Sequence, residues 1–203
     1  MPPAARAALG FSPHVGWAAV VAIAGPRDAP RVVAKDRVVL ATTFETGAVF
    51  HAAQALPLAE AEARLRAAEA AFLASARERI AELAAGLRAR GLEPAAAAIL
   101  SGAGRPLPPL ASILRSHALV HAAEGELYRS VLARASEACA LPATRVPARD
   151  LAPRVAAATR LPPDRIPSVL AELGKAAGRP WGRDQKDAAL AAWLALAGSP
   201  RGR

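Results

Sequence analysis

The clearest hydrophobic pattern in the chain lies between residues 58 and 90, where apolar side chains recur at three- and four-residue steps. Leu65, Phe72 and Ile80 belong to this stripe, and its spacing is that of an amphipathic helix whose apolar face packs on a core. Gly91 follows the last periodic residue and is typical of a helix C-cap. The pattern therefore predicts one long helix over 58–90, lying on a sheet.

Three shorter apolar runs, rich in β-branched residues, precede this helix. Residues 8–24 predict a first strand, residues 31–41 a second and residues 47–56 a third. Turn-forming residues fill the segment between the first two, at 25–30. Because the connections are short, we expect an antiparallel meander in which the second strand is antiparallel to the first and the third.

The second half of the chain alternates strands and helices. Residues 94–100 predict a buried fourth strand, residues 110–138 a second long helix and residues 144–147 a fifth strand. The remainder predicts three helices, at 151–159, 164–174 and 184–197. No internal repeat and no long linker divides the chain, so we expect one domain over 1–203, with the last helices, about 151–197, as an extension.

The composition adds a strong positive charge to this picture. The formal net charge is +9, and the basic residues are nearly all arginine, because lysine occurs only at positions 35, 175 and 186. A sequence rich in Ala, Arg and Pro is typical of a bacterial genome with high GC content, so coding bias explains part of the charge. The charge also favours acidic partners such as nucleic acid. A basic binding face and simple solubility both stay open.

One apolar segment, residues 15–25, bears on the compartment. It is too short to span a bilayer, which takes about 20 apolar residues, although Arg6 before it and the small residues at 22–24 imitate a signal peptide. Its β-branched content fits a core strand better. Cys139 is the single cysteine, which excludes an internal disulfide. We therefore expect a cytoplasmic protein with no membrane partner.

The order of the predicted elements is that of an RNase H-like fold. Residues 10–21 (GFSPHVGWAAVV) resemble the opening strand of the RuvC-like Holliday-junction resolvases, in which a glycine, an apolar residue, an aspartate and a proline lead to a Gly-aromatic-Ala-Val run. Residues 184–191 (DQKDAALA) are similar to that family's last helix, where an acidic residue precedes a small apolar run. The resemblance implies an α/β fold, with a mixed five-stranded sheet, helices on both faces and a helical C-terminal extension.

The resemblance also implies a set of site positions. In that family, carboxylates hold two divalent metal ions astride the scissile phosphate. Here Ser12 stands at the first acidic position and Ser101 at the second, and only Asp184 or Asp187 matches the third. One carboxylate and two hydroxyls make a poor two-metal site. We therefore expect a diverged domain that binds nucleic acid or another partner without nuclease chemistry. Asp184 as an N-cap with Asp187 in a capping box is the alternative.

A polar stripe on the second long helix offers a different chemistry. His117, His121, Glu124 and Tyr128 stand at i, i+4, i+7 and i+11, which places them within a narrow arc of the helix. His117 and His121 can share a divalent metal such as zinc with Glu124 as third ligand, or an imidazole can act as a general base. A purely structural role at the edge of the core is the alternative. With Asp187, the stripe is the candidate catalytic set of a metal-dependent hydrolase or nuclease, the second functional hypothesis.

The remaining candidates carry less chemistry. Arg179, Trp181 and Arg183 lie in a linker containing Gly and Pro, where the indole either stacks on a base of a nucleic acid or packs on the core. His14 and His51 stand alone in the sequence, which predicts core or surface positions rather than ligands. The chain has no phosphate-binding glycine loop, Cys/His zinc motif or Gly-x-Ser-x-Gly elbow. Its Ala-rich helices leave self-association into an oligomer open.

Overall fold

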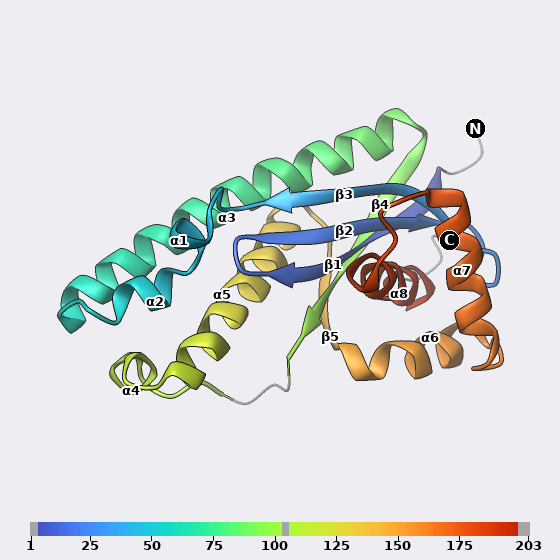
Figure 1. The fold of residues 1–203 in the computed structure, drawn as a ribbon. Coiled ribbons are helices and arrows are strands. Elements are labelled where there is room, and N and C mark those ends of the chain that lie inside the picture. Colours follow the sequence, from blue (N-terminus) through green and yellow to red (C-terminus); the bar gives the residue numbers. More distant parts are fainter. Residues whose placement is uncertain (1–3, 103–105, 199–203) are drawn as a thin grey trace.

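The computed structural model describes residues 4–102 and 106–198. A mixed five-stranded sheet in the order β3-β2-β1-β4-β5 forms its centre, and helices cover both faces (Figure 1). The strands are β1 (Ala5–His14), β2 (Trp17–Ala24), β3 (Arg31–Val39), β4 (Leu92–Ser101) and β5 (Ala143–Pro147). The helices are α1 (Phe44–Gly47), α2 (Val49–Ala53), α3 (Leu58–Ala89), α4 (Leu110–Leu114), α5 (His117–Ala138), η1 (Ala148–Asp150), α6 (Leu151–Thr159), α7 (Arg165–Ala177) and α8 (Arg183–Gly198). The α/β fold around a central first strand is confirmed.

The prediction of one strand over 8–24 is wrong, because this segment is a hairpin. β1 and β2 pair antiparallel, with His14 opposite Trp17 across a two-residue turn. Gly16 in that turn has a φ of +79°, a conformation that favours glycine. Both strands are buried on both faces, so the apolar run continues on each side of the turn and masks it. Gly16 is the residue of this turn that the sequence could have flagged.

The predicted third strand at 47–56 is also wrong, because these residues lie largely in α1 and α2. Thr43 caps α1 by accepting a hydrogen bond from the Thr46 backbone, and the Thr46 side chain accepts one from the Thr43 backbone. A short apolar run fits a buried helix turn as well as a strand. The expected antiparallel meander does exist, but β1, β2 and β3 form it.

The second half of the chain follows the prediction more closely. β4 pairs parallel with β1, and β5 pairs parallel with β4. The predicted long helix at 110–138 is interrupted, however: α4 ends at Leu114 and α5 begins at His117. Ser116 between them has an extended backbone, and its side chain accepts a hydrogen bond from Leu119 N as the N-cap of α5.

Each face of the sheet packs against its own group of helices. Leu9 and Phe11 of β1 lie in a core with residues of α3 and α5, whereas Ala8 lies in a second core with α6, α7 and α8. Within this second core α8 runs across the centre of the sheet, and Trp193 of α8 is completely buried. At the end of β1, residues on one face therefore lie near α3 and α5, and residues on the other face lie near α8. The candidate site lies on the α8 side.

Across the described ranges, none of the helices combines the length and the apolar character needed to cross a membrane.

Candidate functional site

The end of β1 and the first turn of α8 meet on one face of the sheet. Gly10 allows this, since a Cβ at that position would lie 1.9 Å from the carbonyl oxygen of Ala188 in α8. Four residues further along β1, His14 Nε2 lies 3.0 Å from Asp184 Oδ1. Ser12 stands between Gly10 and His14, so strand alternation gives it the same face, and it is only 6% exposed. The family-site position Ser12 is thus next to the start of α8.

Ser101 lies on the other face of the sheet. In the parallel pair of β1 and β4, Phe11 stands opposite Ile99, and both belong to the core on the α3 and α5 side. Leu100 belongs to the core on the α8 side, and alternation returns Ser101 to the face of Ile99. The structure therefore does not bring Ser101 to Ser12. The β4 residue that shares the face of Ser12 is Leu100, which has no metal-binding atom.

Asp184 and Asp187 both lie in the first turns of α8. The helix begins at Arg183, one residue before Asp184, so Asp184 is not the N-cap that the capping interpretation required. Gln185 instead accepts a hydrogen bond from Gly182 N at 2.9 Å. Burial raises the pKa of Asp187, an effect that Asp184 reinforces and that Arg183, 3.6 Å away, opposes. The two carboxylates of this face thus lie on one helix, and the nearest strand positions supply none.

A stack of side chains runs across the same face of the sheet, from α8 to β3. The His14 and Trp17 rings are parallel to within 9°, with centroids 4.3 Å apart. The guanidinium carbon of Arg37 lies 3.5 Å from the centroid of the Trp17 ring. With the His14–Asp184 contact, these residues form a continuous series, Asp184–His14–Trp17–Arg37, which we call the cross-strand stack.

A hollow of about 400 Å³ lies beside the cross-strand stack, lined by Trp17, Ala19, Lys35, Asp36, Arg37, Pro180 and Gln185. Lys35 Nζ holds its wall in place by donating hydrogen bonds to three carbonyl oxygens of the segment before α8. These belong to Ala177 (3.1 Å), Gly178 (2.7 Å) and Pro180 (3.1 Å). The linker that contains Arg179, Trp181 and Arg183 thus borders the hollow next to Arg37.

The three predicted nucleic-acid-binding residues of this linker differ in placement. Arg179 and Arg183 are exposed. The Trp181 indole donates a hydrogen bond to Leu170 O at 3.2 Å and packs closely on Gly174 of α7. Trp181 therefore occupies the joint between α7 and α8. The aromatic ring that lies beneath a cation on this face is Trp17.

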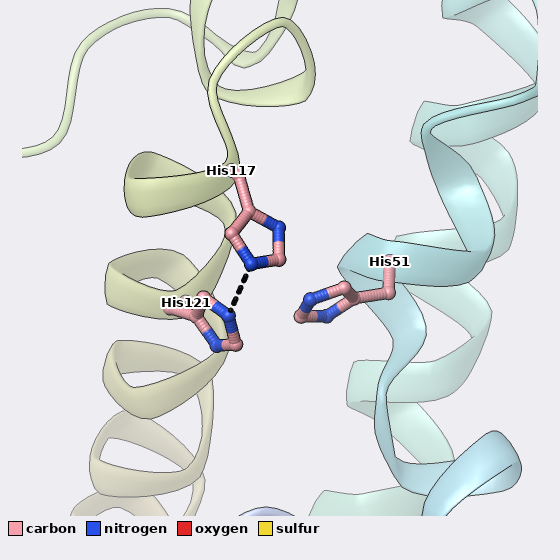
Figure 2. A group of neighbouring side chains, drawn as sticks. All are labelled: His51, His117 and His121. Carbon is pink, nitrogen blue, oxygen red and sulfur yellow. Dashed lines mark hydrogen bonds between the residues drawn. The ribbon is translucent and has the colours of Figure 1, made fainter.

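A second cluster lies on the other side of the sheet, where α2 meets the start of α5. Three imidazoles face one another there: His51 from α2, and His117 and His121 from α5 (Figure 2). His117 Nε2 and His121 Nε2 are 3.0 Å apart. One nitrogen from each of the three rings can be chosen so that all lie within 4.8 Å of one another. His117 and His121 thus come together as predicted, but their neighbour is His51.

Glu124 and Tyr128, the other members of the predicted stripe, are buried and hold α1 and α2 in place. Glu124 Oε1 accepts hydrogen bonds from the backbone N–H groups of Phe50 (3.1 Å) and His51 (3.2 Å). It therefore caps α2, whose own N-cap side chain provides no hydrogen bond. Tyr128 donates to Gly47 O at 2.7 Å. Burial, reinforced by the charge of Glu124, raises the pKa of Tyr128.

Glu124 also contacts His51 from behind. Its Oε1 lies 3.0 Å from His51 Nδ1, but not in hydrogen-bonding geometry, so both His51 Nδ1 and Glu124 Oε2 are buried with no hydrogen-bond partner among the described residues. Sequence reasoning missed His51, because a strand at 47–56 gives no way to relate this residue to the helix stripe. The signal available was compositional: three of the four histidines of the chain form this cluster.

Comparison with known proteins identifies the fold. No family model and no curated protein sequence matches the chain. Thermus thermophilus RuvC in complex with Holliday junction substrate is similar in structure, with a TM-score of 0.55 and 13% identity, covering 93% of this chain and 91% of that one. A second T. thermophilus RuvC structure has a TM-score of 0.52 and 12% identity, with coverages of 93% and 92%. The chain therefore has the RNase H-like fold of RuvC, as its opening strand and element order predicted.

Proposed function

We propose that this chain is a nucleic-acid-binding domain that uses the face of the cross-strand stack and does not perform two-metal phosphodiester hydrolysis. The observation that carries the proposal is that Ser12 of β1 and Leu100 of β4, each one residue beyond the paired Phe11 and Ile99, are the strand residues on that face. These two positions lie where β1 and β4 end beside α8, and neither has a carboxylate.

The chemistry of the face argues against hydrolysis. Two magnesium ions held astride a phosphate need several hard oxygen ligands from more than one element. Asp184 is engaged with His14. Asp187 is partly buried, and its Oδ2 lies 3.6 Å from the Arg183 guanidinium. Two carboxylates on one helix, each with another partner, make a poor two-metal site.

The same face suits a polyanion. Arg37, Arg179 and Arg183 are exposed around the hollow and the start of α8, and guanidinium groups bind phosphates through paired hydrogen bonds. The net charge of +9 adds long-range attraction. T. thermophilus RuvC, which has this fold, was solved with a Holliday junction substrate, and this supports a branched or duplex nucleic acid as the ligand.

Fluorescence anisotropy with labelled four-way junction, duplex and single-stranded DNA tests the proposal. We expect binding that weakens steeply with salt, because each phosphate contact releases counterions. Arg37→Ala should weaken binding and reduce the salt slope by about one. Arg64→Ala, which removes an exposed arginine from α3 on the opposite face, serves as the matched control. Equal losses in both variants would mean that the face is not the binding surface.

A parallel incubation tests the absence of hydrolysis. The same labelled DNAs are incubated with Mg²⁺ or Mn²⁺ and enough protein to bind all of the DNA, and are then separated on a denaturing gel. We expect the DNA to remain intact. Metal-dependent cleavage that Asp187→Ala abolishes would show that the carboxylates of α8 suffice for catalysis and would overturn this part of the proposal.

A further inference from the structure

We propose that His51, His117 and His121 form a binding site for one transition-metal ion of the zinc class, and that Glu124 is a positioning residue for His51. The proposal is independent of nucleic-acid binding. It rests on the residues at the junction of α2 and α5, which lie on the other face of the sheet from the cross-strand stack.

The geometry of the three rings fits a single ion. In a tetrahedral zinc site with Zn–N bonds of ~2.0–2.1 Å, two ligand nitrogens lie ~3.4 Å apart. His117 Nε2 and His121 Nε2 are 3.0 Å apart, and one nitrogen of His51 lies within 4.8 Å of both partner nitrogens. Figure 2 shows one ring nitrogen of His51 pointing toward the two α5 rings. Small side-chain rotations therefore bring all three nitrogens to bonding distance of a common centre.

Glu124 prepares His51 for this role. The carboxylate lies 3.0 Å from His51 Nδ1, and Nδ1 has no other hydrogen-bond partner among the described residues. A small rotation of the imidazole would turn this contact into a hydrogen bond from Nδ1–H, which leaves the lone pair on Nε2 for a metal. A carboxylate behind a ligating imidazole is the usual arrangement in metal sites, where it fixes the ring and increases its basicity. Glu124 is 1% exposed and its Oε2 has no hydrogen-bond partner in the described part of the chain. A cation one imidazole away would offset this buried negative charge.

The surrounding contacts keep the two ligand-bearing helices in register. Glu124 caps α2 through two backbone N–H groups, and Tyr128 binds Gly47 at the end of α1. The Gln54 side chain donates to Leu114 O at 2.9 Å, which ties the end of α2 to the residues just before α5. The three imidazoles are thus held close together from two helices that are 60 or more residues apart in sequence. His117 and His121 are exposed, so an ion has access from solvent and a coordination position is left for water.

The first test uses tag-free protein stripped with a chelator and titrated with ZnCl2 in a calorimeter, alongside metal analysis of protein dialysed against zinc. We expect about one ion per chain. At a hundredfold excess over the dissociation constant, zinc should raise the melting temperature by about 5–10 °C, because it binds the folded chain. Absence of a stoichiometric ion, or an unchanged melting temperature at millimolar zinc, would overturn the proposal.

Single substitutions locate the ion. His121→Ala and His117→Ala remove exposed rings and leave the core intact, and each should weaken zinc binding at least tenfold. His51→Ala should do the same. His14→Ala is the matched control, because His14 is the one histidine outside the cluster and its loss should leave zinc affinity unchanged. An equal loss with His14→Ala would place the ion elsewhere.

Glu124→Gln separates positioning from structure. Glutamine keeps an oxygen that can cap α2, so the melting temperature of the metal-free protein should change little, whereas zinc affinity should fall about 10–100-fold. The visible absorption of bound Co²⁺ should also change, because it reports ligand geometry. A variant with lower metal-free stability but unaltered zinc affinity and cobalt spectrum would show that Glu124 is only a cap and would overturn its positioning role.

Discussion

Gly10 of β1 lies directly beneath Ala188 of α8, so close that a Cβ on Gly10 would stand 1.9 Å from the Ala188 carbonyl oxygen and 2.5 Å from Ala192 N. Backbone atoms, unlike the end of a flexible side chain, cannot move aside for a methyl group. This contact sets the distance between the central strand and the helix that brings Asp184 to His14. Both the packing of the core and the geometry of the proposed binding face depend on it.

Gly10→Ala should therefore lower the free energy of unfolding by about 1–3 kcal/mol or more, as overpacking does in a tight core. Denaturation in urea, followed by circular dichroism, measures this loss. Gly86→Ala is the control, because Gly86 lies in α3 with no atom near its would-be Cβ; this variant should gain about 0.5–1 kcal/mol from helix propensity. Two equal effects would contradict the close approach of α8.

Asp187→Asn should stabilise the fold at neutral pH and leave it less sensitive to pH. Burial raises the folded-state pKa of Asp187 above its ordinary value of 3.8. The folded state therefore binds more protons than the unfolded state between the two pKa values, and stability falls as pH rises through this window. Asparagine does not titrate, so the Asp187→Asn variant does not lose this stability as pH rises.

Melting curves recorded from about pH 4 to pH 8 measure this linkage. The difference between Asp187→Asn and the unaltered chain should grow as pH rises through the folded pKa and then stay constant. Asp28→Asn, which changes an exposed aspartate in the β2–β3 turn, should follow the unaltered chain. A difference that shrinks with rising pH would reverse the assigned direction of the pKa shift.

Tyr128→Phe should cost about 1–3 kcal/mol, because it leaves the buried carbonyl of Gly47 without its donor. The ring itself is retained, so its packing against Phe72 (centroids 5.3 Å apart) persists. Urea denaturation gives the free energy, and hydrogen exchange of the α1 and α2 amides shows where the loosening occurs. Unaltered exchange in these helices would mean that the hydroxyl does not hold them.

Lys35→Met should loosen the segment between α7 and α8. The ammonium group donates to three carbonyls there, and hydrogen bonds from charged groups contribute about 1.5–3 kcal/mol. Limited trypsin digestion with mass spectrometry should show faster cleavage after Arg183. Lys175→Met removes an exposed lysine of α7 and should digest at the original rate; faster cleavage in both variants would point to charge rather than to the three hydrogen bonds.

The fold was largely predictable because most of its elements have distinct periodicities. The stripe through Leu65, Phe72 and Ile80 marks α3, and the motif at residues 10–21 marks the central strand. Strands buried on both faces lack polar alternation, so the sequence showed one strand where Gly16 divides two. Residues 47–56 were misassigned because the cap of α2 is not local in sequence: it comes from Glu124, 73 or more residues away.

The candidate sites were predictable only where the residues share one element. His117 and His121 stand four apart on α5, so spacing alone brings them together. His51 joins them through tertiary packing. Ser101 failed as a partner of Ser12 because a single step along a strand reverses the face: Leu100, its neighbour, is the residue on the α8 side.

The position of α8 has a consequence for biosynthesis. This helix covers the centre of the sheet, where Ala188, Ala191 and Ala192 are completely buried, yet in sequence it follows all five of the described strands. Until residues 183–198 have left the ribosome, the apolar face formed by β1, β2 and β4 has no cover from α8 and is open to other chains. A nascent chain halted before α8 therefore exposes an apolar surface that a chaperone would bind. For the same reason, truncation at the linker before α8 should promote aggregation.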